Sequence, residues 1–124
     1  MAYTISTDKD RNRLYVVFTG FFGDEETTEA CEAVLAAARE LGPGFDIVTD
    51  ISGFKLTSET GASSIARLQK DLGALGVSRV VRVVGDSVLA NMQLSRTARE
   101  AGYGPGVKPD TVRSRAEAEE LLDS

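Results

Sequence analysis

Histidine does not occur in this sequence, and cysteine occurs only once, as Cys31. Without histidine, Ser-His-Asp and Cys-His catalysis are excluded, and so is a His-ligated zinc site. A single cysteine forms neither an internal disulfide nor a thiolate metal cluster, and it indicates a reducing compartment. Because no nucleophile–base pair is evident, we expect a protein that is not an enzyme and that carries no cofactor.

Long apolar runs and an excess of basic charge are also missing. No run approaches the roughly 18 apolar residues of a membrane span, and the N-terminal segment lacks the apolar region of a secretory signal. The net charge is −5, which argues against a general nucleic-acid or anionic-membrane binder. The 124 residues fit one domain with one core, and we expect a single cytoplasmic domain over residues 1–124.

The densest acidic run is Asp24, Glu25 and Glu26. It follows a glycine-bounded segment, and Asp24 has the character of a helix N-cap. Carboxylates in a first helical turn are stabilised by the positive end of the helix dipole. We favour that interpretation over a magnesium or calcium site, because no spacing of the EF-hand kind follows.

Strand and helix patterns alternate along the chain, which predicts an α/β fold. We expect a mostly parallel sheet of about five strands, joined by right-handed crossovers, with an antiparallel N-terminal strand and about four helices. A Gly-Phe-Phe-Gly break is expected after the second strand, at residues 20–23, and a loop at residues 102–110. The expected strands are residues 3–7, 13–19, 45–51, 77–84 and 111–113, and the expected helices are residues 24–41, 58–75, 87–101 and 114–122.

The segment DISGFKLTSETGA, residues 50–62, indicates a strand end, a short turn and a helix start. Thr57 and Ser58 are both good N-cap residues, since their hydroxyls accept backbone N–H bonds. Glu59 then falls in the first turn, where the helix dipole favours a negative charge. Gly61 is costly inside a helix, which indicates close approach of another backbone or of a partner surface.

Two stretches carry a resemblance to a known family. Asp50-Ile51-Ser52-Gly53, with Gly61 at the matching spacing, resembles the signature of STAS domains of the anti-sigma factor antagonist (SpoIIAA-like) group. The stretch VFTGFFGD at residues 17–24 is similar to that family's passage from a strand into the first helix. The resemblance covers nearly the whole chain in element order. It implies a bacterial regulator that binds a protein partner, such as an anti-sigma factor or kinase.

The match departs from the family at the phosphoacceptor. Ser58 stands at the family's aspartate position, Glu59 at the phosphoserine position and Thr60 at the second serine. Glutamate cannot be phosphorylated, but it holds a fixed negative charge where the family's switch places one. Two interpretations of Glu59 stay open, a helix-stabilising carboxylate and a built-in phosphate mimic. For Ser58 and Thr60 the alternatives are capping and a displaced phosphoacceptor.

Phe21 and Phe22 are expected beside the Glu59 turn, because loops that follow parallel strands share one edge of the sheet. Adjacent strand residues face opposite sides, so one of the two can anchor an interface while the other packs in the core. The alternative is that both pack in the core. We therefore expect a partner-binding or switch surface at Ser58, Glu59, Thr60, Gly61, Phe21 and Phe22.

The alternative is a SpoIIAA-like module that binds a lipid or small ligand among its helices, because the later helix and loop resemble the branch grouped with CRAL-TRIO-type folds. An apolar cavity of about 300 Å³ or more favours that alternative, whereas a filled core with an exposed apolar patch favours a partner surface. A homodimer is compatible with either.

Overall fold

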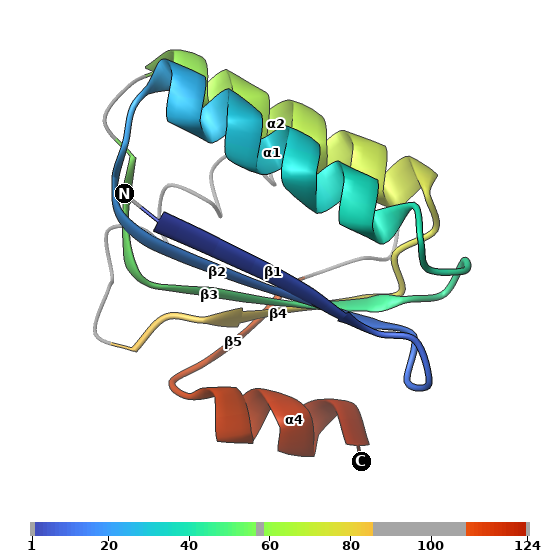
Figure 1. Ribbon diagram of the computed structural model, residues 1–124. Coiled ribbons are helices and arrows are strands. Elements are labelled where there is room, and N and C mark those ends of the chain that lie inside the picture. Colours follow the sequence, from blue (N-terminus) through green and yellow to red (C-terminus); the bar gives the residue numbers. More distant parts are fainter. Residues whose placement is uncertain (1, 57–58, 86–108, 124) are drawn as a thin grey trace.

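The computed structural model describes residues 2–56, 59–85 and 109–123 (Figure 1); the side chains of residues 21, 22, 24, 54–56 and 59–63 lie outside this description. Five strands form one sheet in the order β1-β2-β3-β4-β5. β1 pairs antiparallel with β2, and the later neighbours all pair in parallel, as the sequence predicts. The strands are β1 Ala2–Asp8, β2 Arg13–Phe22, β3 Asp46–Leu56, β4 Arg79–Val83 and β5 Asp110–Val112.

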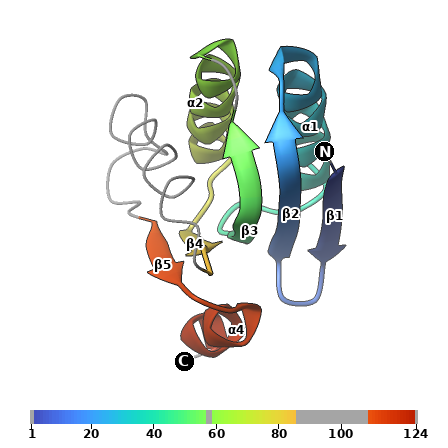
Figure 2. The ribbon, with the colours of Figure 1, turned by 90° about the vertical axis from the view of Figure 1, so that its left-hand side faces the viewer.

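Helices cover both faces of this sheet (Figures 1 and 2). The first two, α1 (Asp24–Ala38) and α2 (Glu59–Ala74), lie side by side on one face, and α4 (Arg115–Asp123) lies on the other. The described residues therefore contain three of the four expected helices; the expected helix at residues 87–101 and most of the loop after it lie outside them. None of the described helices combines the length and apolarity that crossing a membrane requires.

Each face of the sheet carries its own apolar cluster. The larger one lies under α1 and α2 and includes Val80 of β4, whereas Val81 and Val83 pack with Ala118 of α4 on the opposite face. Successive strand side chains point to opposite faces, so a strand covered on both sides needs a continuous apolar run. This explains why Val80, Val81 and Val83 of β4 are all buried, although the strand also contains Arg79 and Arg82.

Two helix boundaries differ from the predictions. Gly23, not Asp24, is the N-cap of α1, in an extended conformation and without a side-chain cap bond. The α1 helix ends at Ala38 instead of near Leu41, because the chain tightens there: the Leu41 N–H donates to the Ala38 carbonyl, three residues back. Acidic residues nevertheless occupy the first turn of α1, as expected.

The α4 helix begins at a capping arrangement of Ser114 and Glu117. The Glu117 N–H donates to the Ser114 hydroxyl at 3.2 Å. The Glu117 carboxylate in turn accepts the Arg113 N–H at 3.2 Å, one residue before the cap. The Ser114 hydroxyl thereby satisfies one N–H group that the helix start leaves unpaired, and the Glu117 carboxylate satisfies an N–H of the segment that leads into the helix.

Candidate functional site

The β2 and β3 strands continue past the rest of the sheet as a two-stranded extension. β3 pairs with β4 only as far as Asp50, opposite Val83, but it stays paired with β2 through Leu56. The extension bends toward the level of the helices, and α1 and α2 both begin at its end (Figures 1 and 2). The sequence predicts that these strands end at Thr19 and Ile51, before a break and a turn, and both predicted ends are wrong: β2 continues to Phe22 and β3 to Leu56.

A bulge in β3 forms the base of this extension. Between the pairs Val17↔Asp50 and Thr19↔Gly53, β2 advances two residues and β3 three, so β3 contains one extra residue. The Asp50 carboxylate accepts both the Ser52 N–H, at 3.0 Å, and the Ser52 hydroxyl, at 2.7 Å. These two bonds hold the bulged backbone, so the Asp-Ile-Ser-Gly stretch is a bulge and not a turn.

Glycines occupy both strands where they cross this bulge, and one of them is required by its backbone conformation. Gly20 has a φ of +87°, which side-chain-bearing residues rarely adopt. At Gly53 an added Cβ would lie 3.4 Å from the Thr19 side chain, an ordinary van der Waals distance, so the fold accepts a side chain at this position. In the sequence these glycines have the appearance of strand ends, yet both strands continue through them.

The backbones of five of the six predicted site residues lie at the far end of the extension. Phe21 pairs with Lys55 and Phe22 with Leu56, and only residues 57 and 58 separate Leu56 from Glu59, the first residue of α2. The backbones of Glu59, Thr60 and Gly61 form the first turn of that helix. Ser58 lies outside the described residues, as do the side chains of the other five. The partner-binding or switch surface formed by these six residues therefore stays a prediction.

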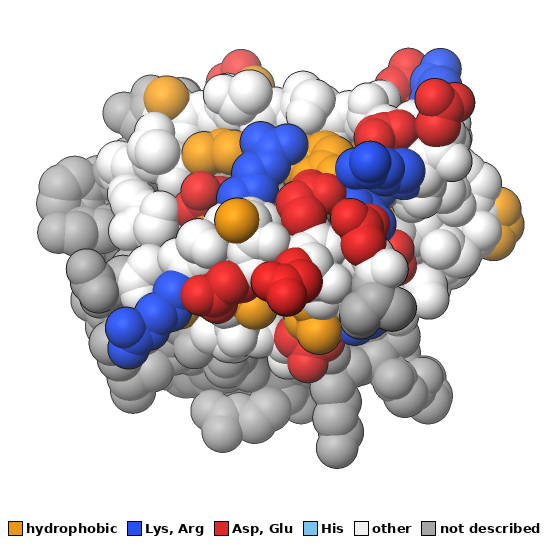
Figure 3. Space-filling view, turned by 90° about the horizontal axis from the view of Figure 1, so that it is seen from below, with side chains coloured by type: hydrophobic (Ala, Val, Ile, Leu, Met, Phe, Trp, Pro, Cys, Tyr) orange, Lys and Arg blue, Asp and Glu red, His pale blue; other side chains and the backbone are white. Residues whose placement is uncertain are grey.

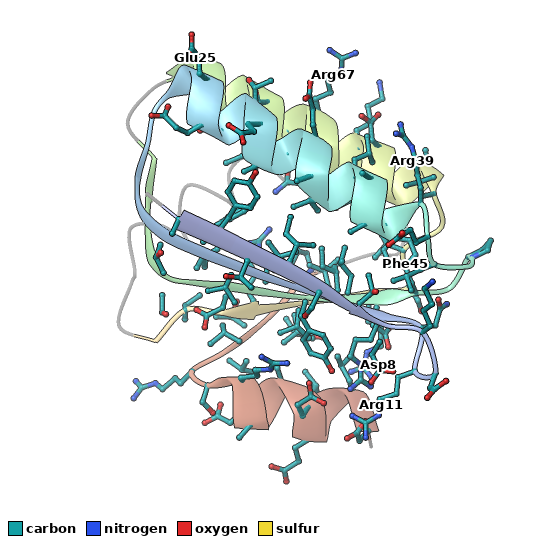
Figure 4. The ribbon with its side chains drawn as sticks, viewed as in Figure 1. Asp8, Arg11, Glu25, Arg39, Phe45 and Arg67 are labelled. Carbon is teal, nitrogen blue, oxygen red and sulfur yellow. The ribbon has the colours of Figure 1, made fainter. Side chains whose placement is uncertain are left out.

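The start of α1 lies at the same end of the molecule. Glu25 is exposed, and its side chain points away from the sheet (Figure 4). The Thr27 hydroxyl donates to the Gly23 carbonyl at 2.6 Å, one turn back within the helix start. Among the residues that the structure describes, no cluster of three or more potential metal ligands occurs.

A groove between α1 and α2 was not predicted. It encloses about 330 Å³, open to the solvent, and Arg39 and Arg67 lie on its rim (Figure 4). Across it the hydroxyls of Thr28 and Ser64 lie 3.4 Å apart. The sequence does carry charged residues at helical spacing on each helix, at positions 32 and 39 of α1 and at positions 67 and 71 of α2. A pattern in one helix does not reveal which other helix it faces.

Among the described residues, the space between the sheet and the helices above it is small. The cavity between the sheet and α2, which Phe18, Ile65 and Leu72 help to line, holds about 30 Å³. This is roughly the room for one water molecule. It is far below the volume expected for a lipid or small-ligand pocket.

The opposite face, which carries α4, is highly charged. Figure 3 shows acidic and basic side chains interspersed there with small apolar spots. Arg115 lies over the ring of Tyr15, with 4.3 Å from its guanidinium carbon to the ring centre. This charge pattern contrasts with the apolar contacts that lie beneath α4.

No protein-family model matches the sequence, and a comparison with curated proteins finds no match. Solved structures do match. The unphosphorylated form of the anti-sigma factor antagonist SpoIIAA superposes with a TM-score of 0.60 at 11% identity, covering 98% of this chain and 96% of that one. The phosphorylated form of the Bacillus cell fate determinant SpoIIAA gives 0.55 at 12% identity, covering 98% and 99%. The chain therefore has the fold of SpoIIAA along nearly its whole length, as the resemblance implies.

Proposed function

We propose that this domain is a non-enzymatic regulator that binds a protein partner through the end of the sheet where α1 and α2 begin. The observation that carries the proposal is the β2–β3 extension. It sets the backbones of Phe21 and Phe22 beside the strand that leads directly to Glu59. The similar solved structures support it, because they are an anti-sigma factor antagonist and its phosphorylated form. By that likeness, the partner is an anti-sigma factor, a kinase or a related regulator in the bacterial cytoplasm.

In this proposal Glu59 acts as a permanent switch charge. A phosphoserine carries about −1.5 to −2 charges at neutral pH, whereas a carboxylate carries −1. Both are stabilised at a helix start, because the unpaired N–H groups and the helix dipole favour negative charge there. The protein would then stay in one partner-binding state, without needing a kinase to reach it.

The alternative, a lipid- or small-ligand-binding module, has less support. The cavity of about 30 Å³ between the sheet and α2 is too small for such a ligand. The groove of about 330 Å³ between α1 and α2 is large enough, but charged side chains of Glu32, Arg39, Arg67 and Asp71 line it. Apolar ligands bind pockets with mostly apolar walls, so this groove suits them poorly.

The test compares partner affinity between the wild type and two variants, Glu59→Gln and Glu59→Ser, using the anti-sigma factors encoded in the same genome. Glu25→Gln is the matched control, because it removes a carboxylate from the first turn of α1 at the same end of the molecule. We expect the Glu59 variants to change affinity by about tenfold, which corresponds to about 1.4 kcal/mol, and the control to change it little. Equal affinities for all four proteins would leave Glu59 only a helix-stabilising role.

A second experiment asks whether the position can be switched. Glu59→Ser restores a hydroxyl at the family's phosphoacceptor position, and the anti-sigma factor kinase is then offered both proteins. We expect mass spectrometry to find phosphate on residue 59 of the variant and none there on the wild type. Phosphorylation at Ser58 or Thr60 of the wild type would instead identify a displaced phosphoacceptor and contradict the fixed-charge interpretation.

A further inference from the structure

The outer edge of β1 is open. β1 forms one margin of the sheet, and within the described part of the chain only β2 pairs with it (Figure 2). All seven residues of β1 take part in that pairing, in unbroken register from Ala2 opposite Thr19 to Asp8 opposite Arg13. A straight edge strand presents a row of backbone N–H and C=O groups to the solvent, and these groups can pair only with another extended strand.

This edge lacks the usual protection against pairing. Natural edge strands are blunted by lysine, proline, bulges or shortness. From Tyr3 to Thr7 the strand has no charge and no proline, and most of its residues are β-branched or aromatic. The opposite margin differs, because β5 has three residues and begins with Asp110. The β5 edge therefore has features that discourage strand pairing, whereas the central residues of β1 lack them.

The helix above β1 presents small residues on that side. Thr28 and Leu35 line the groove toward α2, so at about 100° per residue the stripe of Ala33 and Ala37 lies on the opposite flank, toward the open edge. Both alanines are partly exposed. Below them the Tyr3 hydroxyl donates to Glu29 at 3.1 Å, which fixes α1 over the edge strand.

We propose that the open edge of β1 binds a second copy of this chain, by antiparallel pairing of the two β1 strands. With Ile5 on the twofold axis, Thr4 of each copy lies opposite Ser6 of the other, and Tyr3 lies opposite Thr7. Directly opposed residues share a face in an antiparallel pair. The half-buried side chains of Tyr3, Ile5 and Thr7 from both copies then form one continuous stripe under the helices.

Self-complementarity selects a second copy over an unrelated peptide. The five central residues of β1 are uncharged, so like charges do not oppose one another across the axis. The α1 helices of the two copies can also pack against each other in this dimer. Strands lie about 4.8 Å apart and α1 lies over β1 and β2, so α1 and its copy come to about 10 Å, the spacing of closely packed helices. Ala33 and Ala37 suit that close approach.

The dimer has a consequence for partner binding. Antiparallel pairing directs the two β2–β3 extensions to opposite ends of a ten-stranded sheet. The pairing therefore leaves both helix starts exposed, and each dimer presents two copies of the proposed partner surface. The inference rests on the β1 edge and does not depend on what that surface binds.

The test uses charge at exposed positions of β1. The side chains of Thr4 and Ser6 are both exposed on the face away from α1, so the fold tolerates lysine there. In the double variant Thr4→Lys/Ser6→Lys, two pairs of lysines oppose each other across the axis. Thr4→Glu/Ser6→Glu does the same with negative charge, and a mixture of the two variants pairs lysine with glutamate. Ser78→Lys/Ala116→Lys adds the same charge at exposed positions outside β1 as a control.

Sedimentation velocity over a range of concentrations gives the outcome. We expect the wild type and the control to sediment as dimers of the 13.2 kDa chain. Each double variant alone should raise the dimer dissociation constant by about tenfold or more. The equimolar mixture of the two variants should bring the dissociation constant back to the wild-type range. A monomeric wild type would overturn the proposal. So would a lysine variant that dimerises like the control, or a mixture no tighter than its components.

Discussion

The guanidinium of Arg13, the first residue of β2, donates to the Glu119 carboxylate of α4 at 2.9 Å. The arginine is 4% exposed, and its second nitrogen donates to Asp123 at 3.1 Å. Arg79 of β4 also bonds α4, donating to the Leu121 carbonyl at 3.3 Å. The bonds of Arg13 and Arg79 thus attach α4 to the sheet, in addition to the apolar contacts of the buried face of α4.

Replacing Arg13 should release part of this attachment. Arg13→Met keeps most of the aliphatic packing but leaves the Glu119 carboxylate, whose side chain is 26% exposed, without its buried partner. We expect a loss of about 1–3 kcal/mol in the free energy of unfolding, measured by urea denaturation. Arg11→Met is the control. It contacts the same carboxylate oxygen at 3.4 Å from a 55% exposed side chain, so it should cost less than about 0.5 kcal/mol. Equal losses of unfolding free energy in the two variants would show that the burial of Arg13 does not strengthen its contact with Glu119.

The β3 bulge gives a second prediction. Asp50→Ala removes the acceptor of both Ser52 bonds, whereas Asp50→Asn keeps an oxygen that accepts them. Because both residues are partly exposed, we expect Asp50→Ala to cost about 1 kcal/mol of stability and Asp50→Asn clearly less. Partner affinity should fall with Asp50→Ala as well, since the bulge directs the extension toward α2. If the two variants behave alike, the carboxylate bonds do not hold the bulge.

The directions of the strands were predictable because each depends on a local pattern. Alternation of strand and helix patterns implies parallel neighbours, and the polar turn at residues 8–12 implies a hairpin. The ends of β2 and β3 were not predictable in this way. Gly20 and Gly53 have the same appearance whether a strand stops or bulges, and only the partner strand decides between the two.

The charged contacts of α4 were beyond the reach of local patterns for another reason. Arg13 appears as the polar start of an apolar strand, yet its acceptors lie 106 and 110 residues further along the chain. Its burial depends on how α4 docks, and no periodicity within either element encodes that. For the predicted site, sequence order placed Phe21, Phe22 and Glu59 at one edge of the sheet, but their side-chain orientations depend on packing that is not local.

The start of α2 supplies a third prediction. Glu59 is the first helical residue of α2, so we expect Ser58, the residue before it, to act as the N-cap. A cap hydroxyl accepts a backbone N–H of the first turn, and its removal costs about 0.5–2 kcal/mol. Ser58→Ala should therefore lower the urea midpoint, while Thr57→Ala, one residue before the cap, should lower it less. Unchanged midpoints for both variants would show that backbone or solvent contacts alone satisfy the helix start.

The last prediction concerns the reactivity of Cys31, which is 8% exposed beside the α1–α2 groove. Burial, with a smaller contribution from the Glu32 charge, raises the pKa of this thiol to about 12 from an ordinary value of 9.0. Only the thiolate reacts, so at pH 8 the folded protein holds about a thousandfold less reactive form than an unhindered thiol does. We expect iodoacetamide to modify the folded protein at least about a hundredfold more slowly than the urea-unfolded protein.

The same shift links Cys31 to stability. Because the folded pKa is the higher one, this contribution to stability is fully present below pH 9 and is lost as the pH rises toward 12. The unfolding free energy of the wild type should therefore fall more steeply between pH 9 and 11 than that of Cys31→Ala, which has no thiol to ionise. Parallel pH profiles for the two proteins, or equal alkylation rates in the folded and unfolded states, would contradict a buried, neutral thiol.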